Sequence, residues 1–449
     1  MKKFAYRLLL AISFVVTCVA STVHPVAAQA SLATGAASQH SPNSPITGYT
    51  LPPEKLPKAH ALYVIQVWVY LFSTLYSFIL LVMFLRKRWF AIFRDWAERA
   101  SQRRFVQAAI VIPLFTIAFS VFMLPIGIYQ HSQGLKFGLS VQGWTSWFRD
   151  WSIQLLLAVV VGTIVGWILF VVLRRSPQRS WFYFWLAIIP ISAFLAFISP
   201  AVIEPMFNKF QPLDATNPQL VSALEQVVQR GGLEIPRSRM YEMKASEKLT
   251  GSNAYVSGFG ATKRVVVWDT AIAKMTPQEI QFVFGHELGH YVLQHIVKGF
   301  ILTMAFWFLL FYATFRLSQW AWRIWGEGLG IRSLGDWASL PLLLLISSIL
   351  IFISTPVASA VSRHFEHQAD VYGLEIVHGL FPDSQQVAAN SFQRLGEEWL
   401  DYPYASQAAV LWLWDHPSIP DRIRFALTYD PWKNGKSPQF VKSSPAAAE

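Results

Sequence analysis

The chain has 449 residues, of which 53% are hydrophobic and only 14% are charged. Soluble globular proteins usually carry about 25% charged residues, so this composition excludes an ordinary soluble enzyme. A net charge of +11 with a mean hydropathy of +0.36 excludes a nucleic-acid-binding protein and predicts a basic protein of the lipid bilayer. Cys18 is the only cysteine, which excludes intrachain disulfides, cysteine-ligated zinc and iron–sulfur clusters.

The N-terminus has the features of a secretory signal peptide. Basic residues precede an apolar run over 8–20, and small residues allow cleavage after Ala30. We expect residues 1–30 to be a signal peptide, with a retained first membrane anchor over 8–26 as the alternative. Residues 31–60 are rich in Ser, Ala, Pro and Gly and predict a linker.

Apolar stretches without a single charge predict membrane-spanning helices, because about 20 helical residues cross the hydrocarbon core. Six such stretches follow the linker: 62–85, 105–128, 151–173, 181–203, 299–315 and 338–361. Soluble proteins rarely bury helices of this length and apolarity, so we expect a polytopic membrane protein.

A polar segment over 204–296 separates the fourth and fifth stretches. Apolar residues at helical spacing predict a helix over 213–230. A glycine-containing loop between 253–259 and 264–268 predicts a β-hairpin. The sequence Thr-Pro-Gln-Glu at the start of 276–294 predicts a capped helix.

The distribution of Lys and Arg predicts the orientation in the membrane. The loops after the first and third stretches are strongly basic, whereas the loop between the second and third stretches contains only Lys136 and Arg149. This pattern places the basic loops in the cytoplasm. We expect a multi-pass protein of the cell (inner) membrane with its polar segment and C-terminal region outside the cytoplasm, and a disordered tail over 431–449.

The predicted helix over 276–294 contains the motif His-Glu-Leu-Gly-His. His286 and His290, four residues apart, project from one helix face and can occupy two positions of a tetrahedral zinc site. Glu287 lies beside them and can polarise a bound water. The alternative is a pair of buried histidines held only by hydrogen bonds.

A catalytic zinc needs a third protein ligand and an open position for water. Glu366 and Asp370 follow the last apolar stretch on what we expect to be the same continuous helix, four residues apart. Glu366 suits the role of third ligand, and Asp370 suits the role of a carboxylate that accepts a hydrogen bond from a ligand imidazole. By chemistry alone, His364 and His367 are rival ligands.

These residues belong to a longer pattern that resembles the CAAX prenyl protease type 1 family, which consists of integral-membrane gluzincin metallopeptidases. The resemblance covers about residues 50 to 427 in order. The matching segments are 200–210, 252–255, 263–270, 286–290, 362–363, 366–370, 416–417 and Arg422.

The resemblance implies a role for each matching site residue. It implies one Zn²⁺ per chain, held by His286, His290 and Glu366. It implies that Glu287 is the general base and that Asp370 is an orienting group or proton donor. It further implies that the peptide lies on the strand Asn253-Ala254-Tyr255 and that His416 and Arg422 contact the peptide and the oxyanion. The alternative for His416 is a simple turn before a helix.

The resemblance also implies the fold, which is a predominantly α-helical polytopic membrane protein with six or seven spans enclosing a chamber and a small α+β zincin-like catalytic region. Its N-terminal transmembrane helices would occupy 61–205. A metallopeptidase domain over 206–430 would include the two spans at about 299–315 and 338–361.

The expected function is zinc-dependent endoproteolysis, with a peptide or membrane protein as substrate. Prenyl groups are attached in the cytosol, so an active site outside it favours membrane-associated or misfolded envelope proteins as substrates. The rivals are an intramembrane zinc protease of the site-2 type, a transporter, and a scaffold with a structural zinc site closed by His367. A transporter would place charged residues inside its spans, and a scaffold leaves Glu287 without a role.

Overall fold

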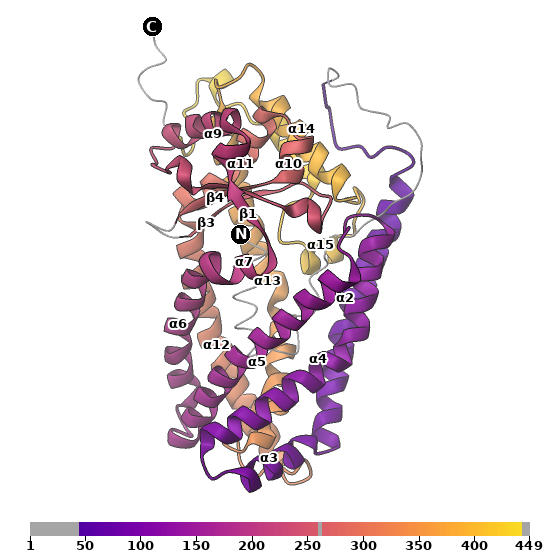
Figure 1. The fold of residues 1–449 in the computed structure, drawn as a ribbon, viewed down its shortest axis with the longest axis vertical. Helices are drawn as coiled ribbons and strands as arrows, with labels where there is room; N and C mark the ends of the chain where they lie inside the picture. Colours follow the sequence, from indigo (N-terminus) through magenta and orange to yellow (C-terminus); the bar gives the residue numbers. More distant parts are fainter. Residues whose placement is uncertain (1–44, 259–262, 442–449) are drawn as a thin grey trace.

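Six long helices run side by side along the length of the molecule (Figure 1). The computed structural model describes residues 45–258 and 263–441, and the expected signal peptide lies outside them. Within the described residues six helices are long and apolar enough to cross a membrane, which confirms the predicted spans. They are α2 (Leu56–Arg86), α4 (Arg104–Lys136), α5 (Trp144–Arg175), α6 (Ser180–Ile198), α12 (His295–Trp325) and α13 (Leu340–Val377).

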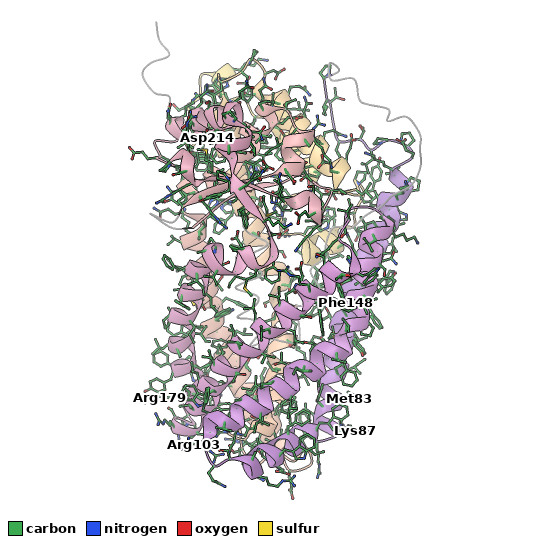
Figure 2. The ribbon with its side chains drawn as sticks, viewed as in Figure 1. Met83, Lys87, Arg103, Phe148, Arg179 and Asp214 are labelled. Atoms are coloured by element: carbon green, nitrogen blue, oxygen red, sulfur yellow. The ribbon has the colours of Figure 1, made fainter. Side chains whose placement is uncertain are left out.

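The loops between these helices alternate between the two ends of the bundle. Figure 2 shows Lys87, Arg103 and Arg179 at one end and Asp214 at the other. The amphipathic helix α3 (Trp89–Ala100) lies at the basic end. The loop that joins α12 to α13 meets α3 there, because the guanidinium of Arg94 lies 2.7 Å from the Asp336 carboxylate.

The opposite end carries a small α+β region with its own hydrophobic core. Four strands pair in the order β1-β2-β4-β3, so β3 is an edge strand. The pair β2–β4 is parallel, and β3–β4 is the predicted antiparallel hairpin. The strands are β1 (Phe210–Pro212), β2 (Met240–Met243), β3 (Ala254–Ser257) and β4 (Arg264–Trp268).

Short helices surround this sheet. The helix predicted over 213–230 is split, because Pro218 begins a new helix after a single non-helical residue. A π-helical turn (Ser199–Ile203) joins α6 to α7 (Glu204–Phe207). The remaining helices are α8 (Leu213–Thr216), α9 (Pro218–Arg230), α10 (Asp269–Lys274), α11 (Pro277–Val292), α14 (Ser384–Glu398), α15 (Gln407–Leu413) and α16 (Ile419–Thr428).

The ordered part of the chain extends further at both ends than the composition predicts. Within the expected linker, the Tyr49 hydroxyl donates to the carbonyl oxygen of Asp401 over 2.8 Å. Within the expected disordered tail, the backbone N–H groups of Phe440 and Val441 donate to the buried Glu375 carboxylate. The predicted linker and tail were therefore too long, because long-range hydrogen bonds and packing against the α+β core fix parts of both segments.

Helices α11 and α13 cross at glycine residues, and this crossing brings the two predicted ligand segments together. A Cβ atom on Gly373 would lie 3.0 Å from the backbone nitrogen of His286. One on Gly285 would lie 2.7 Å from Cγ2 of Ile376, and one on Gly289 would lie 2.9 Å from Cβ of Tyr372. Glycine at these positions allows the two backbones to approach closely.

We expect Gly373→Val to destabilise the protein by about 1–3 kcal/mol, because the added methyl groups force the helices apart. Gly299→Val is the matched control, since a Cβ at Gly299 meets nothing within 4 Å. The comparison is the midpoint of thermal unfolding in detergent. Equal midpoints for the two variants would contradict the close-crossing argument.

Candidate active site

The helix that carries the predicted metal ligands begins at a complete capping box. The Thr276 hydroxyl accepts from the backbone N–H of Glu279, and the Glu279 carboxylate accepts from the N–H of Thr276 over 2.7 Å. Pro277 occupies the first helical position, where its missing N–H is not needed. These contacts fix where α11 begins and therefore which face carries His286 and His290.

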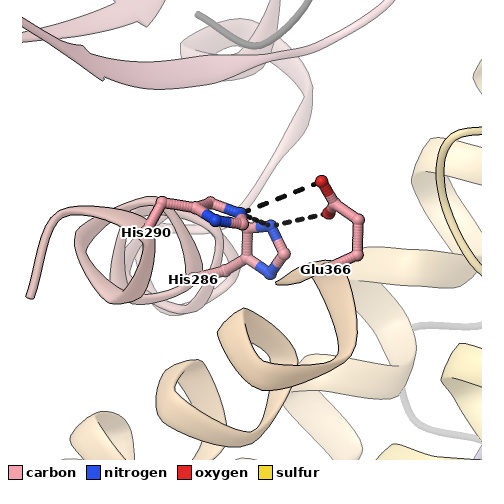
Figure 3. A group of neighbouring side chains, drawn as sticks. All are labelled: His286, His290 and Glu366. Atoms are coloured by element: carbon pink, nitrogen blue, oxygen red, sulfur yellow. Dashed lines mark hydrogen bonds and ion pairs between the residues drawn. The ribbon is translucent and has the colours of Figure 1, made fainter. Parts of the chain in front are cut away.

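Three buried side chains from α11 and α13 converge in the way that a metal site requires. One ligand atom from each of His286, His290 and Glu366 lies within 4.8 Å of the others. Figure 3 shows both imidazoles and the carboxylate pointing toward one another. The two Nε2 atoms are 3.1 Å apart, and Nε2 of His286 is 3.2 Å from Oε2 of Glu366. Two imidazole nitrogens and a carboxylate form a donor set that suits zinc.

The rival ligands on α13 lie elsewhere. His364 and His367 are exposed, whereas Glu366 between them is fully buried. The His367 ring packs edge-on against Phe425, with ring centroids 4.6 Å apart. The helix α13 is continuous from Leu340 to Val377, as expected, and its rotation turns Glu366 and Asp370 toward α11.

A buried carboxylate holds the first ligand imidazole. Oδ1 of Asp370 is 2.7 Å from Nδ1 of His286, and Arg422 of α16 donates to both oxygens of Asp370. Burial opposes a charge on His286, but the hydrogen bonds that it donates to Asp370 and Glu366, together with the charges of these carboxylates, raise the pKa of His286 to about 9. The centre therefore favours a positive charge at this position.

Glu287 and His416 border the cluster on its more open side. Glu287 is only partly buried, and its Oε1 lies 3.9 Å from Nε2 of His286. His416 lies in the turn between α15 and α16, where its Nε2 is 3.3 Å from Oε1 of Glu366. Its Nδ1 is 2.6 Å from Asp415. The structure thus places the predicted general base and the predicted histidine next to the three ligand candidates.

The predicted substrate strand lies directly beside the metal-ligand helix, because α11 packs against β3. Tyr255 points inward, and its hydroxyl donates to Glu204 over 2.8 Å. Burial, and then the adjacent Glu204 charge, raise the pKa of this hydroxyl well above its usual value. Ala254 is also buried, and Asn253 precedes the strand. At the sheet edge, β3 therefore presents backbone N–H and C=O groups for pairing rather than these side chains.

Sequence reasoning missed His295, the first residue of α12. Its Nδ1 lies 2.8 Å from Nδ1 of His290, and its Nε2 lies 2.9 Å from Oε1 of Gln368. The available signal was a third histidine five residues after His290. On a continuous helix, a residue five positions after His290 would point away from it, so the helical pattern did not indicate a role for His295.

Comparisons with known proteins agree with this geometry. Residues 214–430 match peptidase family M48, and residues 36–209 match the CAAX prenyl protease N-terminal family, described as five membrane helices. The uncharacterized metalloprotease YhfN of Bacillus subtilis is 33% identical over 78% of this chain and 79% of its own length.

Eukaryotic proteins and a solved structure match as well. CAAX prenyl protease 1 of Saccharomyces cerevisiae is 30% identical over 42% of this chain and 41% of its own length. The crystal structure of S. mikatae Ste24p aligns with a TM-score of 0.69 and 19% identity, covering 95% of this chain and 97% of that one. That likeness supports the expected fold, in which membrane helices enclose a chamber beside a small α+β region.

The fold and the site together define a membrane-embedded metalloprotease. The chain belongs to peptidase family M48. This confirms the enzyme class and the family resemblance that the sequence predicts, and it supports neither the transporter nor the scaffold alternative.

We expect Asp370→Asn to weaken zinc binding about 10- to 100-fold, because the partner that orients His286 loses its charge. Asp214→Asn is the control, since this carboxylate is half-exposed and its ion pair with Arg237 is at the surface. Affinity is measured by competition with a chromogenic chelator. Equal affinities of the two variants would argue against an orienting role for Asp370.

Proposed function

We propose that the protein is a zinc-dependent endopeptidase whose single zinc ion is held by His286, His290 and Glu366. The observation that supports this assignment is their burial and convergence at the crossing of α11 and α13, next to Glu287. Zinc bound there supplies Lewis acidity, which activates a water molecule and stabilises negative charge on the scissile carbonyl.

The chain's own residues perform the remaining steps. Glu287 takes the proton of the attacking water and passes it to the leaving amine. Asp370 fixes the tautomer of His286 by accepting its Nδ1 proton, and Arg422 holds Asp370 in place. His416, at the rim beside Glu366, donates to the oxyanion. Arg422, which the family resemblance assigns to the peptide and the oxyanion, is instead a positioning residue in this proposal, because it is buried against Phe392 and donates to Asp370.

The substrate peptide binds in an extended conformation by adding a strand to the edge of β3, from Asn253 through Tyr255. Backbone hydrogen bonds recognise an extended peptide without selecting its sequence. The edge position of β3 and its packing on α11 support this role, since a strand added there lies beside the metal ligands.

We expect Glu287→Gln to lower kcat/KM about 10²- to 10⁴-fold, because the general base is lost. The variant keeps its zinc, since Glu287 is not a ligand. Hydrolysis of an unstructured reporter peptide and zinc content are measured on the same detergent-purified sample. Glu234→Gln, an exposed carboxylate in the same region, is the control and stays fully active.

Two results would count against this assignment. Zinc loss in Glu287→Gln would make Glu287 a ligand, and full activity would remove it from the mechanism. A zinc-free wild-type protein that still cleaves the peptide would contradict the metal-dependent reaction itself.

The catalytic region lies outside the cytoplasm of the cell (inner) membrane in this proposal. The basic loops gather at the end of the bundle opposite the α+β region that contains α11, and such loops stay in the cytoplasm. Relatives are named CAAX prenyl proteases, but prenyl groups are attached in the cytosol. Membrane-associated or misfolded envelope proteins are therefore the substrates that we propose.

Single-cysteine labelling tests the orientation. In a Cys18→Ser background, we expect Glu234→Cys to react with a membrane-impermeant maleimide in intact cells, and Gln178→Cys to react only after lysis. Both positions are exposed. Gln178 adjoins Arg179 at the basic end (Figure 2), and Glu234 follows α9 of the α+β region at the opposite end (Figure 1). The reverse pattern would place the active site in the cytoplasm and favour prenylated substrates.

A further inference from the structure

His295 occupies a buried position between His290 and the part of α13 that carries Glu366. Its side chain is hydrogen-bonded to His290 on one side and to Gln368 on the other. Its ring stacks on Phe365, with centroids 4.5 Å apart and planes 10° apart. Phe365 and Gln368 flank Glu366 on α13.

We propose that His295 is a positioning residue that orients the imidazole of His290 for zinc, with Gln368 fixing the orientation of His295. This inference rests on the proposed zinc site. In this inference the Nδ1 atom of His290 is hydrogen-bonded to a neutral imidazole, that of His295, whereas Nδ1 of His286 is hydrogen-bonded to the carboxylate of Asp370.

The proton positions along this chain are mutually consistent. If Nε2 of His290 faces the metal, its Nδ1 carries the proton and donates to Nδ1 of His295. His295 must then carry its own proton on Nε2, which faces the carbonyl oxygen of Gln368. Every donor meets an acceptor, so Gln368 selects the tautomer of His295 that can accept from His290.

The backbone supports the same conclusion. On an uninterrupted helix, five residues rotate a side chain by about 140° from its starting direction, away from His290. The chain instead ends α11 at Val292 and turns through Gln294, which has a left-handed φ of 58°. A non-glycine residue in this conformation costs about 1–3 kcal/mol and persists where the surrounding structure requires it. Here the turn places His295 against the ligand.

The central test replaces His295 with Phe, which keeps an aromatic ring on Phe365 but removes the acceptor for His290. We expect zinc affinity to fall about 10- to 100-fold, as for other partners that orient ligands. In Co²⁺-substituted protein, the visible absorption bands should shift because the His290 ligand is misoriented. His364→Phe is the control, since His364 is exposed on α13 next to Phe365, and it should leave both readouts unchanged.

A conservative variant separates hydrogen bonding from packing. In His295→Asn, Oδ1 occupies the position of the imidazole Nδ1, so we expect it to recover most of the lost affinity although it lacks the ring. If His295→Phe does not fold, Gln368→Met removes the other hydrogen-bond partner of His295 and should also weaken zinc binding.

The outcomes distinguish this inference from the proposed function. A wild-type protein without zinc affinity overturns the zinc site itself. A wild-type protein that binds zinc, with unchanged affinity in His295→Phe or Gln368→Met, overturns the positioning role. A lower melting temperature with unchanged zinc affinity assigns His295 to packing alone and overturns it too.

Discussion

The site depends on the close crossing of α11 and α13, which glycine makes possible. Gly373 lies against the backbone of His286, so the two helices approach more closely than helices with larger side chains can. This approach brings Glu366 and Asp370 of one helix to His286 of the other. Because α13 is also the last membrane span, the third proposed ligand, Glu366, is attached directly to the membrane bundle.

The two proposed ligand histidines are hydrogen-bonded to different side chains, and both sets of contacts reach α13. Asp370 holds His286 and is itself held by Arg422 of α16. His295 holds His290 and contacts Gln368. A displacement of α13 would therefore act on both imidazoles, whereas a displacement of α12 would act on His290 through His295. The metal centre and the membrane helices form one packed unit rather than a soluble domain on a separate anchor.

Local signals predicted the parts of the molecule that local chemistry determines. The capping box, the His-Glu-Leu-Gly-His motif and the uncharged spans act within one helix, and the structure contains each of them. The choice between Glu366 and His367 as ligand depended on the rotation of α13, which tertiary contacts set. His295 was missed because the turn at Gln294 breaks the helical period, and the ends of the linker and tail were missed because their contacts are long-range.

The arrangement around β3, the proposed substrate strand, would restrict which substrates can be cleaved. Tyr255 and Arg264 both donate to Glu204, which lies just beyond the π-helical turn of α6, so the sheet edge is bonded to the end of a membrane span. A peptide that adds to this edge must be extended, because strand pairing uses its backbone groups. A folded domain satisfies those groups internally and cannot offer them. If substrates bind at β3 as proposed, unfolded segments and chain ends close to the membrane are therefore cleaved, whereas the folded structure of native membrane proteins protects them.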